Sequence, residues 1–404
     1  MSPPASSTLP TALPSAPTLA LFCKVVDNFG DIGICWRLAR QLAREHGVRV
    51  TLWVDDLRSF RRICPPVDVD AGEQDLAGVL VRHWHGQEGA FVPNEVADIV
   101  VEFFAVDLPP GYVAAMAQRS PRPIWFNLEG LSAEQWVEGC HRLPSMHPRL
   151  KLTKHFFFPG FTARTGGLLH EAGLDAERAA FQGDRSEVAG FLAGFGVEAP
   201  ELDALKVSLF CYPHAPVAGL LQAWAEGAEP VTCLVPEGVA ADAVAAFLGG
   251  ESGSAPVAGA SATHGALTLR VLPFVPQDDY DRLLWACDLN FVRGEDSFVR
   301  AQWADRPFIW HIYPQEENLH HKKLRAFLGR YAGGLDALAD FSLGWNGAVP
   351  VASMPQAWCA LRATLSQVAA HAGDWRRQVQ APGDLATNLL DFAAALKLAQ
   401  ENPV

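Results

Sequence analysis

A strand, a glycine turn, a helix and a second strand follow one another within residues 19–56, and this unit constrains the fold most strongly. Residues 19–26 are β-rich and mostly apolar, which is typical of a strand buried on both faces. Turn-forming residues at 27–33 then end that strand. The order predicts a βαβ unit in an α/β layer fold.

A helix is expected after the turn, because apolar residues recur at i, i+3, i+4 and i+7 from Cys35. The polar residues of this helix are expected to point outward: Arg37, Arg40, Gln41 and Arg44. Gly47 suits the position just past the helix end, and 48–54 supplies the next strand. Asp27 and Asp31 therefore lie at the carboxyl end of the first strand, where open parallel sheets bind ligands.

The two aspartates of the turn admit several interpretations. In the commonest, Asp31 caps the helix and Asp27 only forms the turn. In the second they are functional, because two carboxylates beside glycines crowd like charges without a structural need. A nicotinamide-binding turn, with Asp55 or Asp56 on the ribose, is the third. It is rejected, because the G-x-G-x-x-G fingerprint is incomplete and an acidic turn suits a pyrophosphate poorly.

Composition limits the class of protein. The 404 residues suffice for two domains, and no apolar run approaches the length that spans a bilayer. A net charge of −13 argues against a nucleic-acid surface. Eight scattered cysteines without a C-x-x-C pair predict buried thiols in a reducing cytosol, with neither zinc nor disulfides. The Ser/Pro/Ala-rich start, residues 1–18, is expected to be a disordered tail.

The βα alternation continues along the chain. Further strands are expected at 96–104, 123–128, 206–212, 230–235, 267–274, 288–293 and 306–312. Residues 127–130 follow a strand end and are expected to face the same cleft as Asp27. The aromatic run 155–161 is interpreted as core packing or a domain seam, with a partner-docking surface as the alternative.

The second half of the chain repeats the α/β pattern. Residues 184–201 are interpreted as the domain boundary, which gives domains at 19–184 and 185–404. Residues 249–265 are Gly/Ser/Ala-rich and predict a flexible loop. Helices are expected at 277–286, 356–370 and 384–400, and the last is expected to pack back on the first domain.

A candidate anion site follows the strand that ends in Arg293. The helix that opens at 294–297 offers backbone N–H groups and its dipole to a phosphate, Ser297 can donate, and Arg293 can bind bidentately. Glu295 and Asp296 would repel a diphosphate, so their expected partners are hydroxyls of a ribose or hexose. In the alternative, Asp296 only caps the helix and Arg293 pairs with Glu295.

Other side chains are expected near this candidate anion site. Phe274 and Gln277 lie at the preceding strand-to-helix junction, where a ring and an amide can hold a planar base. His311, His320 and His321 are not spaced as a metal triad, so structural or surface roles are expected. Carboxylates facing a cleft in one domain and a nucleotide-diphosphate pocket in the other describe a GT-B-like glycosyltransferase with two Rossmann-like domains.

Four motifs resemble one family. CKVVDNFGDIGICWRLARQL, WVEGCHRLPSMHP, KHFFFPGFTARTGGLL and FVRGEDSFVRAQWADRPFIWHIYPQEE are similar to the elongation factor P arginine rhamnosyltransferases. The likeness covers nearly the whole chain from Leu19, and the motifs together, in this order, are highly specific.

The resemblance implies a bacterial cytoplasmic enzyme that transfers rhamnose from dTDP-β-L-rhamnose to an arginine of elongation factor P, with inversion. It implies that Asp27 and Asp31 are needed for activity, with Asp31 as the favoured base, and that the first domain docks the protein acceptor. The implied donor contacts are Phe274, Gln277, Arg293, Glu295, Asp296, Ser297 and Tyr313, with Phe210 or Tyr212 less securely placed.

The chemistry of the residues is compatible with this activity. A guanidinium is protonated and a poor nucleophile, so a carboxylate base must orient one nitrogen and take its proton. Neither a metal nor a cofactor is expected, nor a nucleic-acid or membrane partner. Glu295 joins the two aspartates as a catalytic candidate. The alternatives are a glycosyltransferase with another donor or acceptor and a non-catalytic module that binds elongation factor P.

Overall fold

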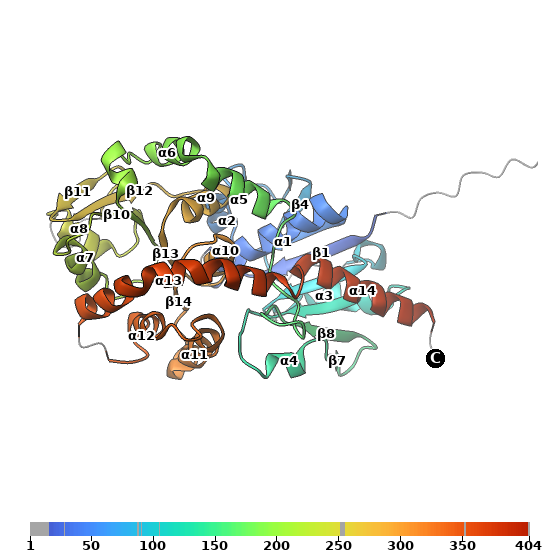
Figure 1. Cartoon of the computed structure of the whole chain (residues 1–404). Helices are drawn as coiled ribbons and strands as arrows, with labels where there is room; N and C mark the ends of the chain where they lie inside the picture. The colour runs from blue at the N-terminus through green and yellow to red at the C-terminus, as the bar shows by residue number, and fades with distance from the viewer. Residues whose placement is uncertain are drawn as a thin grey trace, which may run out of the picture.

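A computed structural model describes residues 16–27, 29–86, 89, 91–104, 106–250, 255–350 and 353–402 (Figure 1). It shows two α/β domains side by side, each built around a mainly parallel sheet. Most of the expected tail, residues 1–15, lies outside the described residues, and the first strand already begins at Thr18. No helix in the described ranges is both long and apolar enough to cross a membrane.

The first domain contains an eight-stranded sheet within the described residues, ordered β3-β4-β2-β1-β5-β6-β8-β7. Its strands are β1 Thr18–Cys23, β2 Arg49–Val54, β3 Glu73–Leu76, β4 Val79–His83, β5 Ile99–Phe103, β6 Ile124–Leu128, β7 Pro144–Met146 and β8 Thr153–Phe157. Only the edge strands β3 and β7 run antiparallel to their neighbours. The parallel centre places the ends of β1, β5 and β6 at one edge, which faces the second domain.

The second domain contains a six-stranded sheet, again counted over the described residues, ordered β11-β12-β10-β9-β13-β14. Its strands are β9 Leu205–Leu209, β10 Val231–Pro236, β11 Ser261–His264, β12 Leu267–Leu272, β13 Leu289–Arg293 and β14 Phe308–His311. The prediction of a flexible loop over 249–265 is wrong for β11, which pairs antiparallel with β12 and places Thr263 opposite Thr268. β-Branched side chains suit such an exposed edge pair.

Helices cover both sheets. They are α1 Gly30–His46, α2 Leu57–Ile63, α3 Pro110–Gln118, α4 Val137–Cys140, α5 Leu174–Gly183, α6 Arg185–Ala193, α7 Val217–Ala225, α8 Ala241–Phe247, α9 Gln277–Ala286, α10 Asp296–Trp303, α11 Leu319–Tyr331, α12 Asp336–Trp345, α13 Met354–Gln380 and α14 Leu385–Glu401. Short 3₁₀ helices occupy Pro93–Glu95, Ala199–Asp203 and Glu316–Asn318.

The chain crosses between the domains twice. α5 packs on the second domain, since Gln182 donates to the carbonyls of Trp285 and Ala304 at 3.1 and 3.0 Å. The chain has therefore joined the second domain before residue 184. At the other end, α13 runs along the second domain and α14 continues onto the first (Figure 1). There Phe392 of α14 lies 5.8 Å from Phe126, between ring centroids, so the last helix packs on β6.

The helix α1 is buried on more sides than its sequence predicts. Leu38 and Leu42 face the first sheet as expected, and Arg44 is exposed. The prediction that Arg37 and Gln41 point outward is wrong, since they are only 2% and 3% exposed. The second domain covers Arg37, whereas Gln41 donates to the His170 carbonyl at 3.0 Å, and the amphipathic pattern of a single helix carries no information about either contact.

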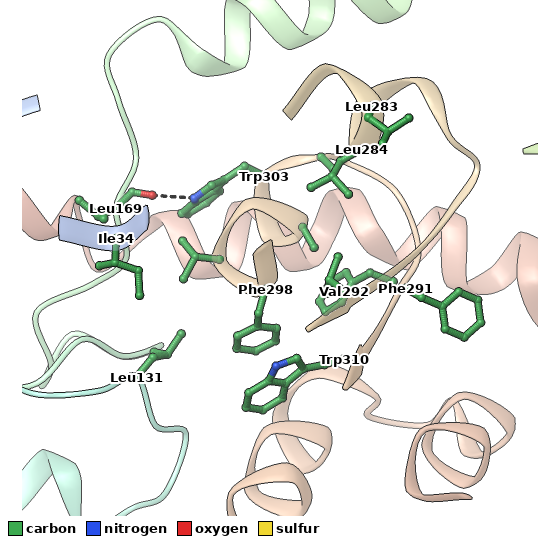
Figure 2. Close-up of a cluster of buried hydrophobic side chains, with 14 of the residues drawn as sticks. Ile34, Leu131, Leu169, Leu283, Leu284, Phe291, Val292, Phe298, Trp303 and Trp310 are labelled. Carbon is green, nitrogen blue, oxygen red and sulfur yellow. Dashed lines mark hydrogen bonds between the residues drawn. The ribbon is translucent and has the colours of Figure 1, made fainter. Parts of the chain in front are cut away.

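A continuous apolar core anchors α10, the helix that carries Asp296 and Ser297 (Figure 2). Phe298 stacks on Trp310 of β14 with ring centroids 3.9 Å apart. The Trp303 indole N–H donates to the Leu169 carbonyl at 2.7 Å. Because large buried side chains fix both ends of α10, the polar residues at its N-terminus are held in place.

Candidate active site

A cavity of about 250 Å³ lies between the two domains at the carboxyl ends of their strands. Seven of the predicted site residues line it: Asp27, Phe210, Phe274, Gln277, Arg293, Asp296 and Ser297. Four others do not line it: Asp31, Tyr212, Glu295 and Tyr313. The structure therefore gathers most of the predicted donor contacts around the cavity, and of the three catalytic candidates Asp27 alone lines it.

Asp27 joins the two domains directly. Its Oδ2 accepts a hydrogen bond of 2.8 Å from the Tyr212 hydroxyl of the second domain. Gly294, at a φ of +63°, approaches so closely that an added Cβ would lie 2.8 Å from this oxygen. Burial raises the pKa of the Asp27 carboxyl, although the Tyr212 hydrogen bond and the Arg293 charge act against that rise.

Asp31 lies in the first turn of α1, and its side chain binds the glycine turn that precedes this helix. Its Oδ2 accepts from the backbone N–H groups of Val26 and Asp27 at 2.7 and 2.8 Å. The interpretation of Asp31 as the helix N-cap is wrong, because the N-cap is Phe29. Burial raises the pKa of Asp31 above its ordinary value, against those two backbone hydrogen bonds. Over the described residues, no hydrogen bond reaches its Oδ1.

Glu295 approaches the same region from the second domain. Its Oε1 accepts from the Leu131 backbone N–H of the first domain at 3.0 Å. Burial raises the pKa of this carboxyl to about 8, and the nearby charges of Asp31 and Asp27 add to the rise. Residues 127–130 do not line the cavity, but Gly130 lies next to Glu295, since an added Cβ there would lie 3.4 Å from Glu295 Oε2.

Arg293 supplies positive charge at the cavity. Its guanidinium lies 4.2 Å from the ring centroid of Phe210 and 4.9 Å from that of Tyr212. Its Nη1 donates to the Cys211 carbonyl at 3.1 Å. The alternative pairing of Arg293 with Glu295 is wrong, because within the described ranges these side chains bind Cys211 and Leu131 instead.

The start of α10 shows contacts that its sequence does not indicate. Ser297 Oγ accepts from the Arg293 backbone N–H and donates its own proton to the Arg293 carbonyl, so the hydroxyl stabilises its own turn. Asp296 does not cap the helix. One of its oxygens accepts from Arg37 at 2.9 Å and the other from Gln277 at 3.1 Å.

Aromatic rings define the rest of the site. Phe274, a predicted base contact, has the Phe29 ring 5.1 Å away and the Arg62 guanidinium 4.8 Å above it. Tyr313 is 42% exposed and lies at the rim, 5.6 Å from the Tyr212 ring. Phe274 is therefore approached from the first domain, while Tyr313 is open to solvent.

A buried histidine holds Tyr212 in place. His311 is fully buried, and its Nδ1 accepts from the Tyr212 backbone N–H at 3.1 Å. Its Nε2 lies 2.9 Å from Nε2 of His214. Burial lowers the pKa of His311 to about 3. These contacts agree with the predicted structural role of this histidine. Over the described residues no group of His, Cys, Asp and Glu is arranged to hold a metal ion.

Sequence reasoning missed several residues of the site, among them Phe29 and Arg62 of the first domain, Glu237 and Tyr280 of the second, and Arg37, which binds Asp296 beside the cavity. Phe29 belongs to the glycine turn and so lies at a strand-to-helix junction like the residues that were found, whereas Arg62 lies in the last turn of α2. The strand-to-helix junction is the sequence signal by which Phe29 could have been recognised as a site residue. Arg37 carries no such signal, because it lies on the polar side of a helix.

The whole chain has counterparts among known proteins. The family model described as elongation factor P (EF-P) rhamnosyltransferase EarP matches residues 19–394. A protein-arginine rhamnosyltransferase of Pseudomonas putida is 50% identical over 380 residues, covering 93% of this chain and 98% of that protein. One of Pseudomonas aeruginosa is 47% identical over 379 residues, with the same coverage of both chains.

Solved structures agree with the sequence matches. The structure described as "Structural basis for EarP-mediated arginine glycosylation of translation elongation factor EF-P" covers 94% of this chain and 99% of its own, at 37% identity and a TM-score of 0.65. A glycotransferase of kitacinnamycin, at 14% identity and a TM-score of 0.50, shares the fold alone. The predicted GT-B-like α/β fold is confirmed.

Proposed function

The chain belongs to the elongation factor P rhamnosyltransferase family, and from this premise we propose that it transfers L-rhamnose from dTDP-β-L-rhamnose to an arginine side chain of elongation factor P. The enzyme is a glycosyltransferase, and its relatives are protein-arginine rhamnosyltransferases. The donor, the acceptor and the inversion at the anomeric carbon are the proposed parts of this function.

The meeting of three carboxylates from both domains at one end of the cavity carries the proposal. Asp27 and Asp31 come from the first domain and Glu295 from the second, close enough for both aspartate charges to raise the pKa of Glu295. With a pKa of about 8 Glu295 is mostly protonated at pH 7, so Asp27 and Asp31 supply the negative charge that attracts a guanidinium, the one side chain that presents five N–H donors in a plane. An acceptor arginine therefore fits this place.

Asp31 is the proposed base. Its Oδ2 is occupied by two backbone N–H groups, which fix the carboxylate and leave Oδ1 to face an acceptor nitrogen. As the new C–N bond forms, the proton of that nitrogen passes to Oδ1 and the C–O bond to the diphosphate breaks. Asp27 orients the guanidinium. A single displacement without a carboxylate nucleophile inverts the anomeric carbon.

The donor is proposed to occupy the cavity between Phe274 and Arg293. Phe274 and Phe210 offer faces to the thymine, and Arg293 with the N-terminus of α10 stabilises the charge on the leaving diphosphate. Tyr313, Gln277, Asp296 and Glu295 remain proposed donor contacts. The positive potential comes from the chain itself, so we propose neither a cofactor nor a resident metal.

Elongation factor P is proposed to dock on the first domain. The acceptor arginine would enter beside Leu131, whose N–H already holds Glu295. The nearby segment carries exposed apolar side chains, with Trp136 50% and Met146 81% exposed. Because the acceptor is a translation factor, we propose a cytoplasmic location, without a nucleic-acid or membrane partner.

Intact mass spectrometry tests the activity. After incubation with this protein and dTDP-rhamnose, elongation factor P is expected to gain one deoxyhexose, localised to an arginine by peptide fragmentation. An unchanged mass with intact donor binding would indicate another acceptor or a non-catalytic binding protein. An unchanged mass without donor binding would contradict the proposed function itself.

Arg293→Ala is expected to weaken dTDP binding by about 10- to 100-fold, because one charge-assisted contact contributes about 1.5–3 kcal/mol. Isothermal titration calorimetry with dTDP measures this change. Arg185→Ala is the matched control, since that side chain is 81% exposed on the second domain. Equal affinities for the Arg293 variant and the parent would remove Arg293 from the donor site.

A further inference from the structure

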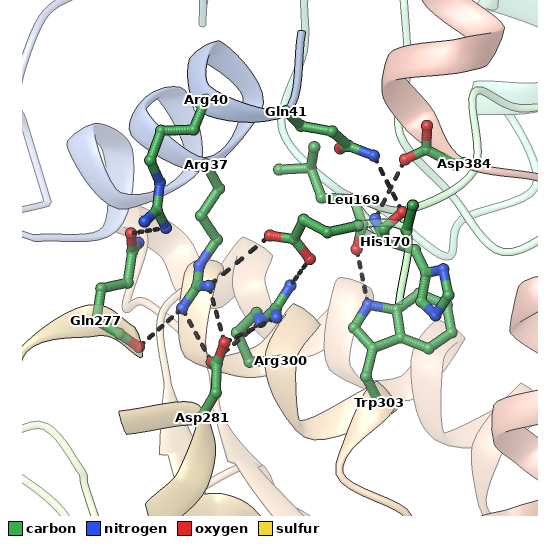
Figure 3. Close-up of polar contacts among 12 residues, drawn as sticks. Arg37, Arg40, Gln41, Leu169, His170, Gln277, Asp281, Arg300, Trp303 and Asp384 are labelled. Carbon is green, nitrogen blue, oxygen red and sulfur yellow. Dashed lines mark hydrogen bonds and ion pairs between the residues drawn. The ribbon is translucent and has the colours of Figure 1, made fainter. Parts of the chain in front are cut away.

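Arg37 of α1 reaches across the domain boundary into the second domain (Figure 3). Its Nε donates to Asp296 Oδ1 at 2.9 Å. Its Nη1 and Nη2 donate to the two oxygens of Asp281 at 2.9 and 3.0 Å, and Nη2 lies 3.3 Å from the Gln277 carbonyl. One guanidinium thus binds two residues that line the donor cavity and one residue behind them.

These contacts fix the orientation of Asp296. Arg37 holds Oδ1, and the Gln277 amide holds Oδ2 while also donating to the Gly33 carbonyl of α1 at 3.0 Å. The helix approaches so closely that a Cβ on Gly33 would lie 3.0 Å from Asp296 Oδ2. The carboxylate at the donor cavity is therefore clamped between its own domain and α1.

A second buried arginine completes the network. Arg300 of α10 donates to both oxygens of Asp281 at 3.0 and 2.7 Å and to Glu171 at 2.6 Å. Arg37 and Arg300 each have a side chain only 2% exposed. Charges so deeply buried require partners in fixed geometry, so this network defines one relative position of the two domains.

The helix α1 also carries the proposed catalytic base of the first domain. α1 begins at Gly30, and Asp31 lies in its first turn, less than two turns before Arg37. A shift of α1 relative to α10 therefore moves Asp31 and Asp27 relative to anything bound beside Asp296. Misplacement of reacting groups by about 1 Å lowers a rate by about 100-fold.

We propose that Arg37 is a positioning residue that couples the two halves of the active site, by fixing the Asp296 carboxylate for the donor and holding α1 at the distance the transfer needs. This inference rests on the proposed function. Arginine suits the role because its planar group reaches Asp296 and Asp281 in two directions at once, which a lysine ammonium cannot do.

Arg37→Lys tests the proposal, because it keeps the charge and removes the fork. The affinity for dTDP and kcat are each expected to fall about tenfold or more, with the KM for elongation factor P unchanged. Arg44→Lys is the matched control, since it makes the same substitution on an exposed position of α1. It is expected to leave all three values within about twofold of the parent.

Two experiments distinguish a positioning role of Arg37 from a purely structural one. If Arg37 has only a structural role, Arg37→Lys would lower the Tm but keep the parental dTDP affinity and kcat at temperatures below that Tm. This result would overturn the proposal. If Arg37→Lys does not fold, the pair Arg37→Met with Asp281→Asn removes one charge of each sign and is expected to show the same loss of dTDP affinity. Parental affinity in that pair would also overturn it.

Calorimetry with dTDP separates this inference from the proposed function. A parent protein that binds no dTDP contradicts the proposed function before any variant is made. A parent that binds dTDP together with a variant of equal affinity contradicts only the role of Arg37.

Discussion

Asp31→Asn is expected to lower kcat for rhamnose transfer by about 10²–10⁴-fold, the range over which a general base contributes. The asparagine carbonyl can still accept from the N–H groups of Val26 and Asp27, because both bind the same carboxylate oxygen. The turn is therefore preserved while the proton acceptor is lost. Single-turnover transfer, followed by the mass of elongation factor P, measures the change.

Asp55→Asn is the matched control for this variant. Like Asp31, Asp55 lies outside the lining of the donor cavity and accepts a backbone N–H just before the turn, from Val25 at 2.8 Å, but it is not one of the three proposed catalytic carboxylates. Its amide variant is expected to transfer rhamnose at close to the parental rate. Near-normal turnover in a folded Asp31→Asn protein would assign the base to another residue, with Asp27 the next candidate.

Glu295→Gln is expected to change how stability depends on pH. The folded carboxyl, with a pKa of about 8, keeps its proton where the unfolded carboxyl, with an ordinary value of 4.5, has lost it. The parent therefore loses stability as pH rises through this interval, by up to about 1.4 kcal/mol per pH unit. Glutamine does not titrate, so the variant gains stability relative to the parent from about pH 5 to pH 8.

Urea unfolding of both proteins at several pH values measures this difference. His311 and His141, whose pKa values burial lowers to about 3 and about 4, make stability rise with pH up to about 6.5. Both histidines are present in the parent and in the variant, so their contribution cancels when one free energy of unfolding is subtracted from the other. A difference that stays constant between pH 5 and pH 8 would show that Glu295 is ionised throughout in the folded protein.

Local patterns of sequence predicted many of the strands and helices of this protein, though not β7 and β8, and indicated candidate site residues. Each strand of the predicted series lies within two or three residues of an observed strand, and α9 has the predicted bounds, Gln277–Ala286. Strand ends followed by glycine or acidic residues indicated Asp27, Arg293 and Asp296 as site residues. These signals are local because backbone periodicity and turn chemistry act between neighbours in the chain.

Tertiary structure alone decided what those residues touch. The sequence places Arg37 on the exposed side of an amphipathic helix and offers Asp296 either as a ligand contact or as a helix cap. In the folded protein Arg37 is buried against Asp296, and Ser297 binds its own turn. For Arg37 the physical reason is that its contacts with Asp281 and Asp296 join residues more than 200 positions apart and depend on which surface covers a helix. The packing of one domain on the other fixes such contacts, and no short-range pattern records them.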